Sequence, residues 1–377
     1  MLWLNVAYIH ALVGPTANSR RGGSPLFASI TSSTTELQPS DVARLKQVLQ
    51  REYTSFFDPM EKDYYAPNVV FVDPLTKLEG IDAYQTNVDL LASRTLLGKI
   101  LFADAGIVLH SVTQESATQL TTRWTLRMTA KILPWQPTAR FTGVSVYKIA
   151  PGGPQGVQVV QQNDYWDSIN LQQGGSYAAV DKGAAVSDFL DQLKPQNLAA
   201  PSAGAELPYQ LLRRGKDYEV RRYPAFSAVE IDYERRDDGF ATLGSFSSGL
   251  TPQAPALLSV PSSGSKRMLW PRSYALPGTE GPLAPEKAVQ KAQQSEWSEC
   301  RILEFPSQVV AVARFTDASV EPVVRRANRK LRDACARDGL QVVETDELRF
   351  AQYDAIFSMG ERRGEVWMDL QDGGHPW

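Results

Sequence analysis

Two related stretches decide the fold of the C-terminal half of this sequence: Val220-Arg-Arg-Tyr-Pro-Ala-Phe-Ser-Ala-Val-Glu-Ile-Asp-Tyr233 and Ile302-Leu-Glu-Phe-Pro-Ser-Gln-Val-Val-Ala-Val-Ala-Arg-Phe315. When the two are aligned, Tyr223-Pro224 falls on Phe305-Pro306. Both copies have the character of β-strands, and a proline is tolerated there only near a strand start or at a sheet edge. The sequence therefore predicts a duplicated β unit.

A helix is expected after each copy of this repeat. We predict a short helix over 237–246 and a longer one over 320–337, in which apolar residues recur at helical spacing before a C-cap at Gly339. A duplicated strand–helix–strand unit indicates pseudo-two-fold symmetry, with a groove between the halves. We assign this α+β domain to 207–372 and the last residues, 373–377, to a tail.

The region 37–171 predicts a second α+β domain. One helix begins at an N-cap, Ser40, and another covers 81–91, with a short strand between them at 69–72. From 99 onward the hydrophobic period falls to two, and we predict long strands at 99–109, 119–133, 138–149 and 157–166. Helices followed by an antiparallel meander are typical of a strongly curved, cone-shaped sheet. We expect Trp124, Trp135 and Trp166 to fill this cone.

Three low-complexity stretches lie outside these elements. Residues 1–36 contain no acid before Glu36 and combine an apolar opening with arginines and a Ser/Thr-rich patch, which favours a targeting leader over a simple disordered tail. The Gly-, Ala- and Pro-rich stretch 172–206 indicates an interdomain linker with one short helix. Seven prolines mark 247–295 as a long loop within the second domain.

Composition excludes several classes of function. The 377 residues carry a net charge of −3, which argues against a nucleic-acid binder working through a basic field. Two cysteines, Cys300 and Cys335, are too few for a disulfide framework or a thiolate metal site. Three histidines, two of them near the chain ends, exclude a histidine metal cluster or a Ser-His-Asp arrangement.

Short motifs carry a resemblance to known families. In the second domain, Tyr218-Glu-Val-Arg-Arg-Tyr223 and Gly364-Glu-Val-Trp367 resemble the signatures of the SOUL haem-binding protein family, although Gly364 replaces the family's asparagine. The family's Ile-Ala-Met-Thr-Thr-Pro-Val segment between the halves is not visible. In the first domain, Phe71-Val-Asp-Pro74 and Asp164-Tyr-Trp-Asp167 resemble an uncharacterised plant and algal domain, similar in shape to the nuclear-transport-factor-2-like cone. The pair implies a plant or algal architecture that is usually directed to plastids.

The SOUL resemblance implies a tetrapyrrole ligand held between the two halves. Because 207–372 contains no histidine, that ligand would be held by hydrophobic contact without an axial histidine. Cys335, on the apolar face of its helix, is expected to be a buried structural thiol. The expected lining residues, aromatic for the macrocycle and basic for the propionates, are Tyr223, Phe226, Tyr233, Phe315, Trp367, Arg325 and Arg329.

Three functions remain open at this stage. The preferred one is a non-enzymatic carrier or buffer of haem or another tetrapyrrole in the plastid, with no other metal and no nucleic-acid partner. The second is an enzyme built in the cone, with Asp73 or Asp164 as base, although both have ordinary roles as turn and strand-end residues. The third is a lipid-surface protein that touches a plastid membrane through the arginine-rich helix predicted over 320–337. The alternative role of that helix is a solvent-exposed face whose basic residues are balanced by nearby acids.

Overall fold

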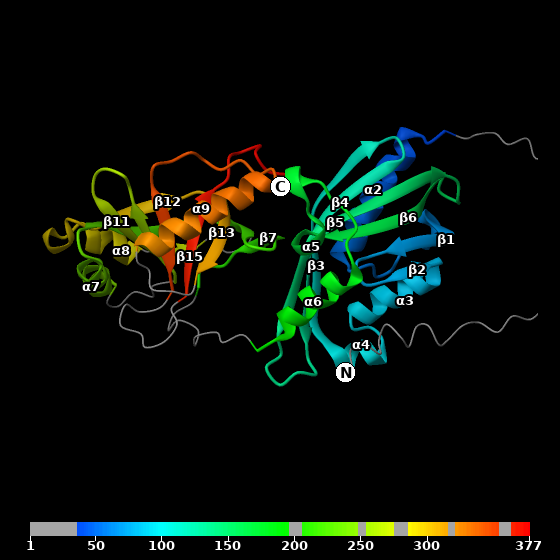
Figure 1. The fold of residues 1–377 in the computed structure, drawn as a ribbon, viewed down its shortest axis with the longest axis horizontal. Helices are drawn as coiled ribbons and strands as arrows, with labels where there is room; N and C mark the ends of the chain where they lie inside the picture. Colours follow the sequence, from blue (N-terminus) through cyan, green and yellow to red (C-terminus); the bar gives the residue numbers. More distant parts are fainter. Residues whose placement is uncertain (1–35, 196–205, 248–253, 275–285, 316–320, 354–362) are drawn as a thin grey trace, which may run out of the picture.

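The computed structural model describes residues 36–195, 206–247, 254–274, 286–315, 321–353 and 363–377, which form two α+β units lying end to end (Figure 1). The first unit holds a six-stranded sheet and the second a nine-stranded sheet. The mixed α+β class expected for both halves is confirmed. In these ranges, no helix is long and apolar enough to cross a membrane. The expected leader lies outside the described residues, apart from Glu36.

The first unit is a bent sheet that curves around helices, with the strand order β2-β1-β6-β5-β4-β3. Its strands are β1 (Tyr65–Val72), β2 (Lys77–Glu79), β3 (Phe102–Ser116), β4 (Gln119–Ala130), β5 (Thr138–Pro151) and β6 (Val157–Trp166). Its helices are α2 (Pro39–Thr54), η1 (Lys62–Tyr64), α3 (Ile81–Leu91), α4 (Leu96–Leu101), α5 (Asp167–Asn170), η2 (Gln173–Gly175) and α6 (Lys182–Leu193). Strand β1 runs parallel to β6, whereas the other neighbours are antiparallel.

Helix α2 supplies much of the core inside this curved sheet. Its residues Leu45, Leu49 and Tyr53 are buried. The helix begins at Pro39 rather than after a Ser40 cap, because proline is preorganised for the first helical turn. Of the three tryptophans expected inside the cone, Trp124 and Trp166 are buried there. The prediction for Trp135 was wrong: it lies in the β4–β5 turn and is 47% exposed.

The second unit is built on the predicted repeat. Its strand order is β12-β9-β11-β10-β14-β15-β13-β8-β7. Its strands are β7 (Gln210–Arg214), β8 (Glu219–Tyr223), β9 (Phe226–Tyr233), β10 (Ala256–Val260), β11 (Lys266–Tyr274), β12 (Arg301–Phe305), β13 (Gln308–Phe315), β14 (Leu348–Gln352) and β15 (Gly364–Asp369). Its helices are α7 (Arg236–Phe246), α8 (Glu286–Ala292), η3 (Ser295–Trp297) and α9 (Glu321–Arg337).

Apart from the edge strand β7, the strand order is symmetric about the β10–β14 pair. Each copy of the repeat is two strands broken at its proline, β8–β9 in the first copy and β12–β13 in the second. The copies pair with each other, since Tyr223 lies opposite Gln308 and Phe226 lies opposite Phe305. Because the alignment places Tyr223 on Phe305 and Phe226 on Gln308, each of these pairs is the symmetry mate of the other.

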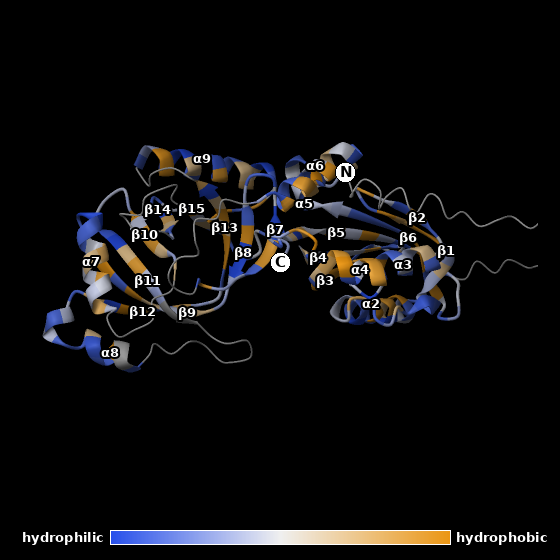
Figure 2. Cartoon of the chain, turned by 90° about the horizontal axis from the view of Figure 1, so that it is seen from below, coloured by the Kyte–Doolittle hydropathy of each residue, from blue (hydrophilic) through white to orange (hydrophobic). Residues whose placement is uncertain are grey.

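The nine-stranded sheet has a different environment on its two faces. Helices α7 and α9 cover one face, and their buried residues Leu243, Phe246, Leu331 and Cys335 join a single apolar core there (Figure 2). The other face carries a smaller apolar cluster from strands of both halves. Since successive side chains of a strand point to opposite faces, residue parity along each strand decides which cluster a residue joins.

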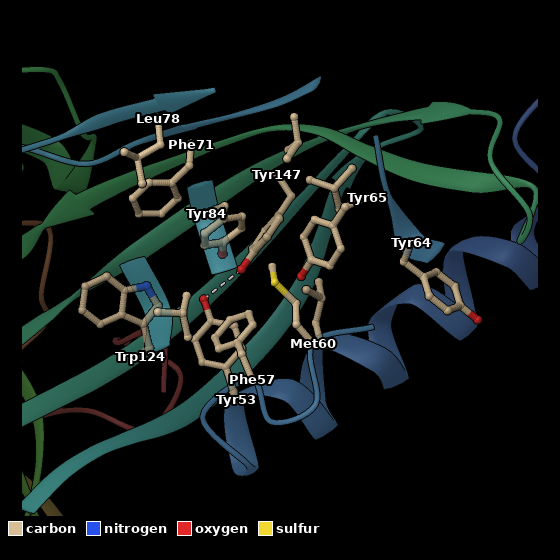
Figure 3. Packing of buried hydrophobic residues seen from close by; sticks show 14 of the residues in the cluster. Tyr53, Phe57, Met60, Tyr64, Tyr65, Phe71, Leu78, Tyr84, Trp124 and Tyr147 are labelled. Atoms are coloured by element: carbon tan, nitrogen blue, oxygen red, sulfur yellow. Dashed lines mark hydrogen bonds between the residues drawn. The ribbon is translucent and has the colours of Figure 1, made fainter. Parts of the chain in front are cut away.

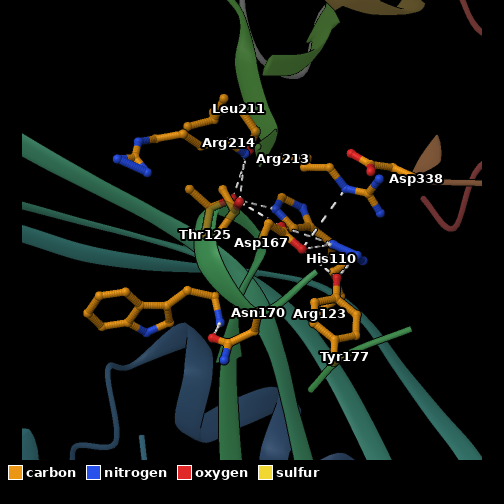
Figure 4. Close-up of polar contacts among 12 residues, drawn as sticks. His110, Arg123, Thr125, Asp167, Asn170, Tyr177, Leu211, Arg213, Arg214 and Asp338 are labelled. Carbon is orange, nitrogen blue, oxygen red and sulfur yellow. Dashed lines mark hydrogen bonds and ion pairs between the residues drawn. The ribbon is translucent and has the colours of Figure 1, made fainter. Parts of the chain in front are cut away.

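A polar network joins the two units (Figure 4). Asp167 pairs with Arg123 at 3.3 Å and accepts hydrogen bonds from the hydroxyls of Thr142 and Tyr177. Across the interface, the backbone N–H of Arg214 in β7 donates to Thr142 Oγ1 at 2.7 Å. The C-terminal Trp377 lies under the guanidinium groups of Arg123 and Arg213, 5.1 and 4.9 Å from its ring centroid. The chain end is thus part of the interdomain contact.

Candidate functional site

A groove of about 150 Å³ opens on the helical face of the second sheet, at the junction of the two halves. The first half contributes residues from β9, the start of α7, β10 and β11, and the second half contributes residues from α9 and β14. The lining residues are Tyr233, Glu234, Arg236, Val260, Lys266, Glu321, Val324, Leu348 and Phe350. The groove is therefore built by the pseudo-two-fold arrangement itself.

The floor of this groove is apolar, and its charges lie at the rim. Val324, Leu348 and Phe350 belong to the buried core beneath it. Burial raises the pKa of Tyr233 to about 12, so its hydroxyl stays protonated at neutral pH. Two cations, Arg236 and Lys266, and two acids, Glu234 and Glu321, stand at the rim, and Lys266 is exposed. The arrangement suits a flat apolar ligand that carries carboxylates at one edge.

The structure divides the aromatic residues predicted for the site between the two faces. Tyr233 lines the groove, and Phe315 lies in the core on the same helical face. Tyr223, Phe226 and Trp367 lie in the smaller cluster on the opposite face. Phe226 and Tyr233 are an odd number of residues apart on β9, so a regular strand must send them to opposite faces. The predicted set does not form one ligand wall.

The opposite face is organised around a buried ion pair. Arg221 donates to the two carboxylate oxygens of Glu365 at 2.9 and 3.0 Å, and both side chains are buried. Tyr353 Oη and Trp367 Nε1 also donate to Glu365, at 2.7 and 3.2 Å. Burial alone would raise the pKa of Glu365, but the guanidinium and the hydrogen bonds outweigh it and hold the pKa below its usual value. The ring of Tyr223 stacks on Trp367 at 4.4 Å.

Family models match a segment in each half of the chain. Residues 205–369 match the family model described as SOUL heme-binding protein. The second half of the chain is a SOUL domain. Residues 43–154 match the model described as uncharacterized conserved protein (DUF2358). No curated protein matches the sequence.

Three solved structures are similar to part of the chain. A nuclear transport factor 2-like superfamily protein from Salmonella enterica is 11% identical, covers 34% of this chain and 91% of its own, and has a TM-score of 0.26. A protein of unknown function with the same superfamily description, from Exiguobacterium, is 15% identical over 34% and 98% of the two chains, with a TM-score of 0.24. A hydrolase from Listeria innocua is 7% identical over 45% and 94%, with a TM-score of 0.31.

The basic helix α9 of the SOUL domain presents most of its cations to solvent. Arg325, predicted to meet propionates, pairs with Glu321 at 2.7 Å, and Arg329 is exposed one turn further along. Neither lines the groove. Arg332 and Arg337 are paired with acids outside the helix. Much of this helix is thus a solvent-exposed face balanced by acids, which was the alternative to a lipid-binding role.

Side chains of the other types that ligate haem iron, Cys, Tyr and Met, also occur in the SOUL domain, among them Cys335, Tyr218 and Met359. Cys335 is buried in the helical core, where burial raises the pKa of its thiol to about 12, as expected for a structural cysteine. Tyr218 donates to Asp338 at 2.9 Å. Met359 lies outside the described residues. Within the described ranges, no group of three or more His, Cys, Asp or Glu side chains is placed to hold a metal ion.

The interior of the cone is packed with aromatic side chains (Figure 3). Tyr53 Oη lies 3.0 Å from Tyr147 Oη and 3.1 Å from Ser145 Oγ. Asp73, one of the two proposed bases, accepts two backbone N–H bonds and a hydroxyl bond from its own turn, so it has the structural role. Burial raises the pKa of the other, Asp164, to about 7. Sequence reasoning missed Glu52, whose pKa burial also raises to about 7.

A wider cleft of about 670 Å³ lies between the SOUL domain and α5–α6 of the first unit. Its charged lining is largely paired within itself. Arg214 makes a two-pronged contact with Asp188, with a shortest distance of 2.8 Å, and Arg221 reaches Glu219 at 2.7 Å. Because so few apolar side chains line this cleft, it suits a macrocycle less well than the groove between the halves does.

Proposed function

We propose that the SOUL domain binds haem or a related tetrapyrrole in the groove between its halves. The observation that carries this proposal is the groove's lining, which both halves supply: an apolar floor of Val324, Leu348 and Phe350 from the second half, and Lys266 and Arg236 of the first half at the rim. The match to the SOUL heme-binding family supports the class of ligand. The lining chemistry fits a macrocycle with carboxylates at one edge.

The size of the groove limits how the ligand is held. Pockets that bury a drug-sized ligand have volumes of roughly 300–1,000 Å³. At about 150 Å³, this groove takes the edge of a macrocycle rather than the whole of it. Held in this way, the ligand exchanges readily, which is what a carrier or buffer needs. Haem bound here would supply its iron and ring chemistry, while the groove itself would bind and orient the ring.

The non-enzymatic role and the plastid location are parts of the same proposal. Asp73 is committed to its turn, and Asp164 accepts a hydrogen bond from Gln162 at 2.8 Å, which supports a non-enzymatic role for the cone. The acid-poor, hydroxyl-rich sequence 1–36 supports delivery to the plastid.

Titration of the full chain with haemin and with protoporphyrin IX, followed by absorbance and tryptophan quenching, tests the site. We expect saturable binding of both ligands, unchanged in His375→Ala. Lys266→Gln should weaken both about five- to tenfold, the loss of one charge-assisted contact of roughly 1–1.4 kcal/mol. Lys216→Gln, on the interdomain cleft, is the matched control and should have no effect.

Other outcomes would contradict the proposal. A strong preference for haemin over the iron-free ring, abolished in His375→Ala, would mean that iron ligation holds the ligand. If Trp367→Phe weakened ligand binding while Lys266→Gln left it unchanged, the binding site would be on the opposite face of the sheet. Absence of saturable binding to either ring would refute the proposal itself.

A further inference from the structure

Helix α4 of the first unit turns its apolar side chains toward solvent. Leu96, Leu97 and Ile100 are 79%, 41% and 53% exposed, whereas Gly98 and Leu101 form its buried side. Polar residues at the three exposed positions would cost the fold little. Three apolar residues facing water on one short helix therefore call for an explanation outside the core.

The orientation of α4 is fixed by its neighbours. Thr95 caps the helix by accepting a hydrogen bond from the backbone N–H of Gly98 at 3.0 Å. A side chain at position 98 would meet the carbonyl oxygen of Leu90 at 2.4 Å, so glycine lets α4 pack closely against the end of α3. The helix cannot roll its leucines inward without losing both contacts. Their exposure is built into the fold.

The apolar surface continues from α4 onto the β4–β5 turn. The backbone N–H of Lys131 donates to the carbonyl of Leu101 at 2.9 Å, which places the start of the turn at the end of α4. In this turn Ile132 is 44% exposed and Trp135 is 47% exposed. The indole N–H of Trp135 donates to the carbonyl of Leu193 at 2.8 Å and fixes the ring. Figure 1 shows α4, this turn and the end of α6 at one edge of the molecule, and in Figure 2 α4 is coloured as strongly apolar.

Two lysines stand within this apolar surface. Lys99 lies on α4 beside Ile100, and Lys131 opens the turn beside Ile132. Both are exposed, and in the part of the chain that the structure describes neither has an ion pair. Exposed Leu and Ile with a tryptophan and flanking lysines is the composition of segments that lie in the interface of a membrane. The uncompensated positive charge selects an anionic surface.

We propose that this tip is a docking surface for an anionic lipid bilayer; the tip comprises Leu96, Leu97, Lys99, Ile100, Lys131, Ile132 and Trp135. The apolar side chains enter the headgroup region, and the lysines contact lipid phosphates at its level. The site lies on the first unit, away from the basic helix α9, and it does not depend on tetrapyrrole binding.

Co-sedimentation of the full chain with vesicles tests this surface. Vesicles of phosphatidylcholine with phosphatidylglycerol should bind the protein, vesicles of phosphatidylcholine alone should bind it more weakly, and added salt should reduce the difference. The double variant Lys99→Gln/Lys131→Gln should weaken binding to the anionic vesicles about 30-fold, from roughly 1 kcal/mol per lysine. Leu96→Gln/Ile100→Gln should reduce binding to both kinds of vesicle.

Matched controls keep the test specific. Val343→Gln removes an apolar residue of similar exposure from the SOUL domain and should leave vesicle binding unchanged. Failure of the wild-type protein to bind anionic vesicles would overturn the proposal. A second outcome would also overturn it: the wild-type protein is a dimer in light scattering, Leu96→Gln/Ile100→Gln is a monomer, and neither binds vesicles. In that case a second copy of the chain would cover the tip. Haemin binding should be the same in every variant, so this test and that of the groove fail independently.

Discussion

Replacing Glu365 by alanine should destabilise the SOUL sheet on its non-helical face, because Glu365 is the buried partner of Arg221. Arg221 is 1% exposed and would keep only Glu219 as a close counter-charge, at 2.7 Å. Removing one partner of a buried pair costs about 3–5 kcal/mol, because the other charge is left desolvated. The hydroxyl of Tyr353 and the indole of Trp367 would also lose their acceptor. Since Glu219 remains beside Arg221, we expect the free energy of unfolding to fall by about 3 kcal/mol, the lower end of that range.

Hydrogen exchange under native conditions measures this loss locally, which matters because a two-domain chain has no single unfolding free energy. Peptides from β13 and β15 should exchange roughly 100-fold faster in Glu365→Ala, whereas peptides from β5 and β6 of the first unit serve as the internal control. The double variant Arg221→Leu/Glu365→Leu should recover much of the protection. Protection of β15 that is unchanged in Glu365→Ala would refute the reasoning.

The pH dependence of the same measurement has a defined sign. The pKa of Glu365 is lower in the folded protein than the usual value of 4.5. Its contribution is therefore complete above pH 4.5 and is lost as the pH falls through the depressed folded value. Wild type and Glu365→Gln should become equally protected in acid.

Three further predictions concern packing, burial and the domain contact. Gly364→Ala should destabilise β15 by about 1–3 kcal/mol, because the new methyl would lie 2.3 Å from the ring of Phe315, and Phe315→Leu should restore protection in the double variant. Burial raises the pKa of Glu52 to about 7, so its contribution to the stability of the first unit is full below pH 4.5 and is lost as the pH rises through 7. The urea midpoint of the first unit should therefore fall over this pH interval in the wild type and stay level in Glu52→Gln; an equal fall in both proteins would contradict this. Deletion of Trp377 removes two cation–π contacts of about 0.5–2 kcal/mol each, so limited proteolysis between the units should accelerate while each unit keeps its own melting transition; an unchanged cleavage rate would count against this role.

The elements of the fold were the most predictable part of the molecule. Helix α3 and strand β6 have the predicted bounds, because hydrophobic period and turn residues are local properties of the sequence. The repeat also predicted a duplicated second domain, but the long loop predicted over 247–295 was wrong, because that stretch contains β10, β11 and α8. The parallel pairing of β1 with β6 was not expected, since nothing local in a short strand encodes its distant neighbour.

The candidate site was predicted less well, and for a physical reason. Aromatic residues on the repeat were grouped together, but Phe226 and Tyr233 lie on opposite faces of the sheet. The sequence already indicated this, because the two residues are an odd number of positions apart on one strand and side chains alternate between the faces of a sheet. The groove residues Leu348 and Phe350 lie on one short strand of the second half, and only the folded sheet brings them beside Tyr233. The exposed leucines of α4 were missed because the predicted strand at 99–109 overlaps the end of that helix.

The mutual pairing of the two repeat copies also determines when the SOUL domain can form during synthesis. Strand β9 pairs with β12 as well as with β11, and β8 pairs with β13 as well as with β7, so each has only one of its two neighbours until the second copy is made. The ribosome makes the chain from the N-terminus, and domains generally fold as units in that order. The first unit can close once β6 has emerged, while the second neighbours of β8 and β9 are complete only when residue 315 has left the exit tunnel. A nascent chain stalled before that point carries a folded cone followed by apolar strands that each have one open edge, which is the species that a chaperone would recognise.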